Sequence, residues 1–313
     1  MKKVLIEFCK SIGIEYVGIV SSGPYNDFRD ILQKRTNKEL SKVFEKGSLE
    51  KAVDPSLTLE DAKSVIVCLF PYYCGTFEGA NLSKYAYSLD YHIIVREKLE
   101  MIGMFLKTSI QGFNYKAFAD NGPLTERYLA YKASLGFYGI NNHIITDKYG
   151  SYVFIGYLIN NYPFEPDKPQ NRTCYQCFNC VKKCPGQCIL GDFTIDSFKC
   201  RSYITQKKEE LTGEDIEILK RHHLIWGCDV CQDVCPHNEN VKETIIKEFK
   251  QNLKYKIEYE ELKQISNKEF LRRYRDRAFS WRGKGVLQRN YEIIHGYTDI
   301  SLGKKIRSKN MLL

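Results

Sequence analysis

Two cysteine-rich stretches constrain most strongly how this chain of 313 residues can fold. The first, "CYQCFNCVKKCP" at residues 174–185, spaces four cysteines by two, two and three residues and closes on a proline. The second, "CDVCQDVCP" at residues 228–236, repeats the pattern with one cysteine fewer. Thiols of a cytosolic chain stay reduced, so clustered cysteines of this kind indicate bound metal rather than disulfides.

The spacing of the first stretch is that of bacterial-type ferredoxins, in which three cysteines bind one cubane cluster and the fourth binds the other. By the same rule, the last cysteine of the second stretch completes the first cluster. The second cluster then lacks one thiolate, and Cys200 in "FKCRSY" is the candidate. The sequence therefore predicts two [4Fe–4S] clusters. Their ligands would be Cys174, Cys177, Cys180 and Cys235 for the first, and Cys184, Cys200, Cys228 and Cys231 for the second.

Zinc is the alternative metal, because paired C-x2-C motifs also form tetrahedral zinc sites. The three-cysteine opening at two-residue spacing and the prolines after both final cysteines favour iron–sulfur clusters. Four of the twelve cysteines, Cys9, Cys68, Cys74 and Cys188, lie outside this scheme. We read Cys9, Cys68 and Cys188 as small buried hydrophobic residues.

The rest of the composition fits a cytoplasmic chain. Hydrophobic residues make up 43% of it, but no run of about 18 apolar residues occurs, so we expect no membrane span. Glu7 and Lys10 interrupt the apolar residues of the N-terminus, and no small-residue cleavage site follows, which argues against a signal peptide. We expect a monomer.

Strand-like and helix-like patterns alternate over residues 1–165. Strands are expected at "EYVGIV", "SVIVCLFPYY", "YKAFAD" and "SYVFIGYLI", and helices at residues 3–12, 95–106 and 124–135, with Gly136 as a stop. This predicts an α/β (α+β) domain in which helices cover a sheet whose strand order cannot be read. A ferredoxin-like domain at 166–240 and a helical C-terminal segment at 241–313 would follow.

Positive charge is concentrated at the end of the chain. Residues 251–313 hold fifteen Lys and Arg against seven Asp and Glu, a net of +8 of the total +9. Such a segment could bind a polyanion or could be a solvated face. An electron carrier needs only the cysteine segment, so the large N-terminal domain favours an enzyme, with a metal-stabilised nucleic-acid-binding module as a third possibility.

Three separate motifs resemble epoxyqueuosine reductases. They are "FADNGPLTERYLAYKASLGFYGINNHII", the cysteine frame with Cys200 ahead of "GCDVCQDVCP", and "SWRGKGVLQRN". The resemblance runs from the N-terminus to about residue 300 in the same order. It implies cobalamin in the N-terminal domain, two [4Fe–4S] clusters that deliver electrons to it, and reduction of epoxyqueuosine to queuosine at the tRNA wobble position. Corrinoid reductive dehalogenases are similar in architecture and provide the alternative activity.

The resemblance also implies roles for individual residues. Asp120 matches the family's proton donor and would protonate the departing oxygen, although an N-cap or Asx-turn in "DNGP" is the structural alternative. Ile144 and Ile155 align with corrin-lining positions of the family, with ordinary core residues as the alternative. Ser202 and Gln206 closely follow the cluster ligand Cys200 and are expected to face the cofactor, with polar loop residues as the alternative. "DYHIIV" lacks the glycine of the corrinoid Asp-x-His-x-x-Gly signature, so we read it as a helix start with His92 in a structural role.

Partners follow from the same resemblance. An external donor of flavodoxin or ferredoxin type would supply electrons. The tRNA would present its anticodon arm to the basic end. There "RRYRDRAFSWRGK" mixes arginines with aromatic residues, a combination that suits phosphate contacts and a splayed base. Arg282 and Lys284 are the predicted tRNA contacts, and Trp281 either stacks on a base or anchors the last helix to the core.

Overall fold

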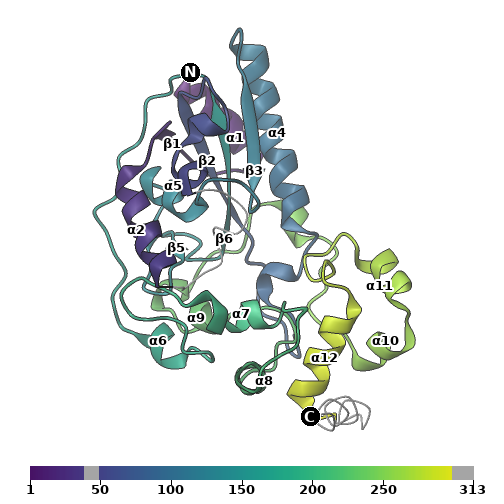
Figure 1. Ribbon diagram of the computed structural model, residues 1–313. Coiled ribbons are helices and arrows are strands. Elements are labelled where there is room, and N and C mark those ends of the chain that lie inside the picture. Colours follow the sequence, from purple (N-terminus) through teal and green to yellow (C-terminus); the bar gives the residue numbers. More distant parts are fainter. Residues whose placement is uncertain (39–48, 298–313) are drawn as a thin grey trace, which may run out of the picture.

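A computed structural model describes residues 1–38 and 49–297. Its centre is a four-stranded antiparallel sheet in the order β1-β2-β6-β3 (Figure 1). The strands are β1 (Tyr16–Ser21), β2 (Ser64–Pro71), β6 (Val153–Asn160) and β3 (Tyr115–Ala119). All four lie where the sequence predicts strands. Every residue of β2 is buried because β2 pairs on both edges and is covered on both faces.

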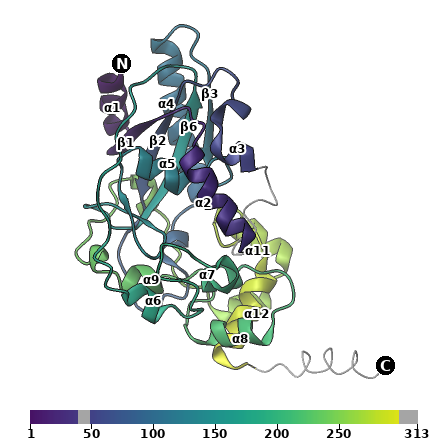
Figure 2. The same ribbon diagram turned by 60° about the vertical axis from the view of Figure 1, so that its left-hand side comes forward.

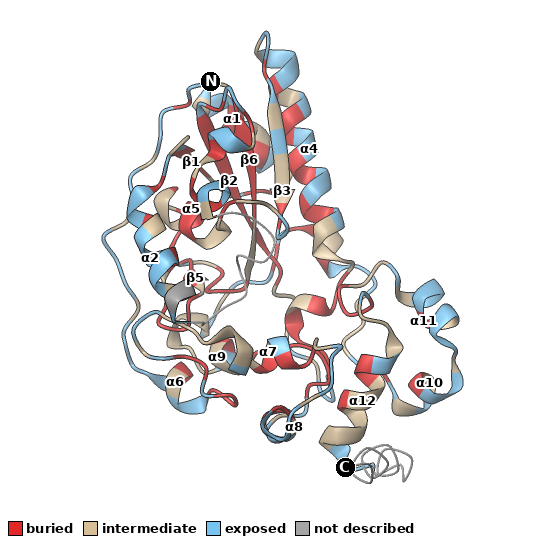
Figure 3. Ribbon diagram, in the orientation of Figure 1, coloured by how far each residue is buried: buried red, intermediate tan, exposed pale blue. Residues whose placement is uncertain are grey.

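Helices cover both faces of this sheet, as predicted (Figures 2 and 3). One face packs against α1 (Lys2–Ser11) and the long α4 (Tyr91–Ser109), through a core that includes Leu5 and Leu99. The other face packs against α2 (Asn26–Asn37), α3 (Leu49–Val53) and α5 (Glu126–Lys132). Alternate residues of β2 serve the two cores, since Ile66 belongs to the first and Val65 to the second.

The helix predicted over residues 124–135 is shorter than expected. It begins at Glu126 and ends at Lys132, and Ser134 adopts a left-handed conformation with φ 62°. Gly136 is therefore not the stop. A Cβ at that glycine would lie 2.5 Å from the Ile145 carbonyl oxygen, so Gly136 allows β4 (Phe137–Tyr138) to start close beside β5 (Ile144–Ile145).

The cysteine region is built from short helices and loops. Its elements are α6 (Asn179–Lys183), η4 (Ser197–Lys199), α7 (Arg201–Ile204), α8 (Gly213–Lys220), α9 (Val230–Asp233) and η5 (Pro236–Asn238). Proline-containing residues 161–173 lead into it without a helix or strand. Short elements suit this region because the loops between them carry the cysteines.

The last described part is helical, as predicted. It comprises η6 (Lys247–Lys250), α10 (Tyr259–Gln264), α11 (Asn267–Tyr274) and α12 (Lys284–His295). These helices share a core with Leu82 and Ala86, near η3 (Lys84–Ala86), and with Trp226 just before the second cysteine stretch. Within the described ranges, none of the helices has both the length and the apolar character to cross a membrane.

Candidate active site and metal centres

The four cysteines predicted to bind the first cluster line one small hollow. Cys174, Cys177 and Cys180 come from the loop before α6 and from its first turn, and Cys235 comes from the residue before η5. Ile140 borders the same hollow. Cys177 is exposed, so this group of cysteines opens to solvent.

The four cysteines predicted for the second cluster also lie together. The Cys231 thiol interacts electrostatically with Cys228, Cys200 and Cys184, which come from three separate loops. Cys188 joins them, with its Sγ 3.4 Å from that of Cys184 and a hydrogen bond to Cys200. Cys188 is buried, as expected of a small apolar residue, but it lies beside this group rather than in the general core. No three His, Cys, Asp or Glu side chains of the described residues are arranged to hold a single metal ion.

Backbone amides are directed at the sulfur atoms of this second group. N–H groups of Gly186 and Ile189 donate to Cys184, and those of Ser202 and Tyr203 donate to Cys200. The pKa of the Cys184 thiol falls to about 6 and that of Cys200 to about 7, first because each sulfur interacts with the Cys188 thiol and then because of these amides. Burial raises the pKa of the other two thiols of this group, Cys228 to about 12 and Cys231 well above its usual value, so the surroundings favour the metal-binding thiolate form at Cys184 and Cys200.

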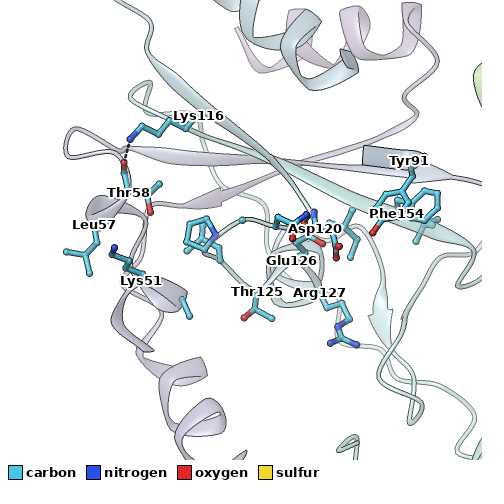
Figure 4. A pocket seen from close by; sticks show the side chains of 17 residues that line it. Lys51, Leu57, Thr58, Tyr91, Lys116, Asp120, Thr125, Glu126, Arg127 and Phe154 are labelled. Atoms are coloured by element: carbon cyan, nitrogen blue, oxygen red, sulfur yellow. Dashed lines mark hydrogen bonds between the residues drawn. The ribbon is translucent and has the colours of Figure 1, made fainter. Parts of the chain in front are cut away.

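Asp120 lies at the meeting point of two large cavities. It follows β3 directly, in a left-handed conformation with φ 62°, and its backbone N–H donates to Glu126 Oε1 at 2.5 Å. A cavity of about 880 Å³, shown in Figure 4, and a second of about 1280 Å³ both border Asp120, Asn121 and Tyr91. The Asp120 side chain is 54% exposed and can therefore reach a bound molecule.

His92 connects Asp120 to the start of α4. Asp90 caps this helix by accepting from the His92 backbone N–H, and its Oδ1 lies 2.6 Å from His92 Nδ1. The other ring nitrogen, Nε2, lies 3.2 Å from Asp120 Oδ2. Hydrogen bonds to Asp120 and Asp90 raise the pKa of His92 to about 9, so the ring is protonated at neutral pH.

Two further groups influence the charge at Asp120. Burial, followed by the nearby Asp120 carboxylate, raises the pKa of Glu126 to about 8. Burial also raises the pKa of Tyr91, which interacts with Asp120 by a hydrogen bond. The site therefore holds several protons at neutral pH around one exposed carboxyl group. This contact of His92 with Asp120 was not predicted from the sequence, in which its signal was the Asp-x-His spacing at a helix start.

The larger cavity adjoins the second cysteine group. Gly227, directly before Cys228, has φ +74°, and a Cβ there would lie 2.5 Å from Ser83 Cβ and 2.9 Å from Tyr85 Cε1. Tyr85 lines the larger cavity, and so does Gln206, six residues after Cys200. The loops that carry the second group thus reach the space beside Asp120.

The remaining predicted cofactor residues have different surroundings. Ile155 lines the smaller cavity. Ile144 is buried in the core under α5 and is not among the residues that line either cavity. Ser202 is half-buried, and its carbonyl oxygen accepts a hydrogen bond from Gln206 Nε2 at 3.1 Å. Ile155 therefore faces the smaller cavity and Gln206 faces the larger one. The Ser202 carbonyl holds the Gln206 side chain in place.

The basic C-terminal segment contributes an exposed tryptophan to the larger cavity. Trp281 is 60% exposed and lines the larger cavity, so it does not anchor the last helix to the core. The Arg282 guanidinium stacks on it, with Cζ 3.7 Å from the ring centroid. Lys284 is less available, because its Nζ donates to the Leu262 carbonyl at 2.6 Å.

Two family models match the chain. One, described as "4Fe-4S double cluster binding domain", matches residues 173–238, and the other, described as "Epoxyqueuosine reductase QueG, DUF1730", matches residues 53–121. The first covers both predicted groups of cluster ligands. The second ends directly after Asp120. The chain therefore contains a 4Fe–4S cluster-binding domain.

Individual proteins agree with these models. An epoxyqueuosine reductase of Listeria monocytogenes is 34% identical over 304 residues, covering 94% of this chain and 80% of the relative. A crystal structure of epoxyqueuosine reductase with an epoxyqueuosine-modified tRNA-Tyr stem loop superimposes with a TM-score of 0.87 at 31% identity, covering 94% of this chain and 80% of that one. A structure of a reductive dehalogenase, at 14% identity and a TM-score of 0.51, shares the fold over 80% of this chain and 34% of its own.

Proposed function

The chain belongs to the epoxyqueuosine reductase family, and we propose that it reduces the epoxide of epoxyqueuosine in tRNA to give queuosine. This reaction consumes two electrons and two protons and releases the epoxide oxygen as water. The observation that carries the proposal is the position of Asp120, which borders both cavities and contacts a protonated histidine. An acid at this point can protonate the oxygen as it departs.

His92 supplies the proton that Asp120 transfers. Its pKa of about 9 keeps it protonated at pH 7, and its Nε2 faces the Asp120 carboxylate. Asp90 holds the ring by the opposite nitrogen and favours its charged form. The proton passes from His92 Nε2 to Asp120 Oδ2 and from there to the oxygen. Asp120 therefore needs no permanent proton of its own.

The two cavities that meet at Asp120, of about 880 and 1280 Å³, support binding of a large cofactor such as cobalamin, which would supply a strongly reducing cobalt centre. The smaller cavity offers the aliphatic side chains of Leu57 and Ile155 as well as polar groups. His92 has both ring nitrogens in hydrogen bonds with carboxylates, which supports a role other than that of a cobalt ligand.

The two cysteine groups would hold one [4Fe–4S] cluster each, which would supply electrons singly. The first group is nearer to solvent through the exposed Cys177, where a donor of flavodoxin or ferredoxin type could dock. The second group adjoins the larger cavity through Tyr85 and Gln206. Electrons would accordingly enter at the first cluster and leave from the second.

The exposed Trp281 would receive the modified base. It borders the same cavity as Asp120, and an exposed aromatic ring is the usual platform for an unstacked base. Arg282 lies against that ring and can contact a phosphate. The anticodon arm would thus approach from the side of α12.

The test uses the anaerobically purified protein with cobalamin, a low-potential reductant and an RNA stem loop that contains epoxyqueuosine. We expect a nucleoside lighter by one oxygen atom, identified as queuosine by mass spectrometry. No turnover by protein that carries both clusters and cobalamin would contradict the proposal. Reduction of an organohalide in its place would favour a dehalogenase-like activity, and clusters without cobalamin binding would favour an electron carrier.

A further inference from the structure

Arg201 is a fully buried cation at the start of α7, directly after Cys200. It is 1% exposed and one of the largest fully buried side chains among the described residues. Arginine is almost never fully buried unless it is paired, because its charge must be removed from water. The group that balances the charge of Arg201 must therefore lie inside the protein.

The protein groups around Arg201 are mostly neutral. Its guanidinium donates five hydrogen bonds to four backbone carbonyls in the last turn of α8 and in the loop after it. They belong to Leu219, His222, Leu224 and Gly227. No carboxylate of the described residues forms an ion pair with it. These carbonyls satisfy donors, but they supply only partial negative charge.

The side chains that attract the Arg201 guanidinium are those of two cysteines. Cys228 forms a hydrogen bond with the guanidinium, and both Cys228 and Cys200 attract it electrostatically. These two cysteines come from different loops, and both belong to the ligand set that we propose for the second cluster. The guanidinium therefore lies against that cluster site and bonds to the loop that leads to Cys228.

We propose that Arg201 is the counter-charge of the second [4Fe–4S] cluster and raises its reduction potential. This inference rests on the two-cluster assignment in the proposed function. A cubane with four thiolates carries a net charge of roughly −2, and reduction adds one more negative charge. A buried cation stabilises the reduced form more than the oxidised form, because the attraction grows with that charge and burial limits screening.

The described residues place no lysine or arginine as deeply buried as Arg201 against the ligands of the proposed first cluster. The lysines close to its ligands, Lys182 and Lys183 at the end of α6, are exposed, so water and salt screen their charges. Arg201 would therefore make the second cluster the more easily reduced of the two. Electrons would pass favourably from the solvent-exposed cluster toward the cavity that holds Asp120.

The competing explanation is that Arg201 only fixes the loop before Cys228 through its carbonyl contacts. Two variants distinguish the effect of the Arg201 charge from the effect of its hydrogen bonds to the loop before Cys228. Arg201→Gln removes the charge and keeps two N–H donors in place of five, whereas Arg201→Lys keeps the charge and loses the planar fork. Arg221→Gln is the matched control, because Arg221 also donates to a carbonyl near the second group, that of Pro185 at 2.7 Å, but is exposed.

The measurement is an anaerobic redox titration of the loaded full-length protein, followed by EPR and visible absorption. The signal that a Cys188→Ala/Cys200→Ser variant lacks identifies the second cluster, since Cys188 lies close enough to replace a lost ligand. In Arg201→Gln we expect the ratio of reduced to oxidised second cluster at fixed potential to fall at least about tenfold, or ~59 mV. Arg201→Lys and Arg221→Gln should stay within about threefold of wild type, and the first cluster should not shift.

Several results would overturn the proposal. One is an unshifted second cluster in loaded Arg201→Gln, and another is an equal shift in Arg201→Lys. If Arg201→Gln loses the second cluster, the Arg201→Lys variant distinguishes the two explanations. A full complement of clusters with the wild-type reduction potential supports the role of the charge, whereas loss of the second cluster in this variant too means that Arg201 only holds the loop before Cys228. Wild-type protein that contains about four irons per chain, in place of about eight, would show that the second cluster is absent. Iron analysis before the titration therefore distinguishes a failure of the two-cluster assignment from a failure of the role of Arg201.

Discussion

His92 and Glu126 determine how the candidate active site responds to pH. Hydrogen bonds to Asp120 and Asp90 raise the pKa of His92 to about 9, and burial raises the pKa of Glu126 to about 8. Each folded-state pKa lies above the unfolded value of the group, so protonation is favoured at low pH and lost as the pH rises through the folded value. Both losses add negative charge around Asp120.

We therefore expect kcat/KM to fall as the pH rises from about 8 to about 9. His92→Gln should lower activity at pH 7 and remove the part of the fall near pH 9, because no imidazolium is then present to resupply Asp120. Glu126→Gln should remove the part near pH 8. Profiles of kcat/KM against pH for the three proteins test this, since kcat/KM reports the free enzyme. A His92→Gln profile that keeps the wild-type shape would exclude His92 as the proton source.

Asp120 is the residue that the mechanism needs most directly. Asp120→Asn should retain cobalamin and both clusters by visible spectroscopy while turnover falls by about 10²–10⁴-fold, the usual contribution of a general acid. Asp192→Asn is the matched control, because Asp192 is exposed and accepts only from the Thr194 N–H. Near wild-type turnover in Asp120→Asn would mean that Asp120 only shapes the turn after β3.

At the scale of elements, the sequence predicted what depends on near neighbours. The strands were recognisable because their apolar residues face two cores in alternation, as Ile66 and Val65 do in β2. The two cysteine groups could also be predicted, although each joins cysteines of separate stretches, because the ferredoxin pattern assigns the last cysteine of one stretch to the other cluster. The strand order was not accessible, since it depends on pairings such as Ser64 with Asn160, which are 96 residues apart.

The same limit explains why part of the candidate site was missed. His92 and Asp120 are 28 residues apart, on α4 and after β3, and only the packing of these elements makes them neighbours. Arg201 follows Cys200 in an unremarkable position, and its burial depends on the loop after α8. Residues that act through distant partners carry no local pattern that would distinguish them.

A buried ion pair joins two short elements, η3 and α9. Lys84 Nζ lies 2.7 Å from Asp233 and 3.6 Å from Asp229, and the Asp229 side chain is almost fully buried. The backbone N–H of Lys84 also donates to Asp229 at 2.9 Å. This pair attaches the N-terminal domain to the helix between Cys228 and Cys235.

Lys84→Met should therefore destabilise the protein by about 3–5 kcal/mol, because it leaves the Asp229 charge buried without its partner. Lys250→Met is the control, since the Lys250–Glu243 pair is exposed and should contribute less than about 1 kcal/mol. Anaerobic thermal melts of the loaded proteins should show a clear fall in Tm for the first variant only. Adding Asp229→Asn to Lys84→Met should recover part of the loss, and a double variant with no recovery would speak against the ion pair.

At the scale of the whole molecule, the positive charge of the sequence is concentrated in its C-terminal part, which the structure describes as far as residue 297. Residues 251–313 hold a net +8, whereas the other 250 residues hold about +1, and the proposed clusters would add negative charge near the middle of the chain. Trp281 and Arg282 lie where this basic end meets the larger cavity. The charge distribution would draw RNA to that side, and the tryptophan would select an unstacked base beside Asp120.

Trp281→Ala should consequently raise the KM for the modified stem loop by about 5-fold to 150-fold, the range that corresponds to a stacking contribution of about 1–3 kcal/mol.

Arg282→Ala should weaken binding and reduce the dependence of log Kd on log salt by about one unit, because one phosphate contact is lost. Lys284→Ala should leave the salt slope nearly unchanged and lower Tm, because its ammonium group already bonds to Leu262 and to Gln288. Binding titrations at several salt concentrations separate these outcomes. A normal slope in Arg282→Ala together with a reduced slope in Lys284→Ala would reverse the two roles, and unchanged binding in all three variants would place the RNA on another face of the molecule.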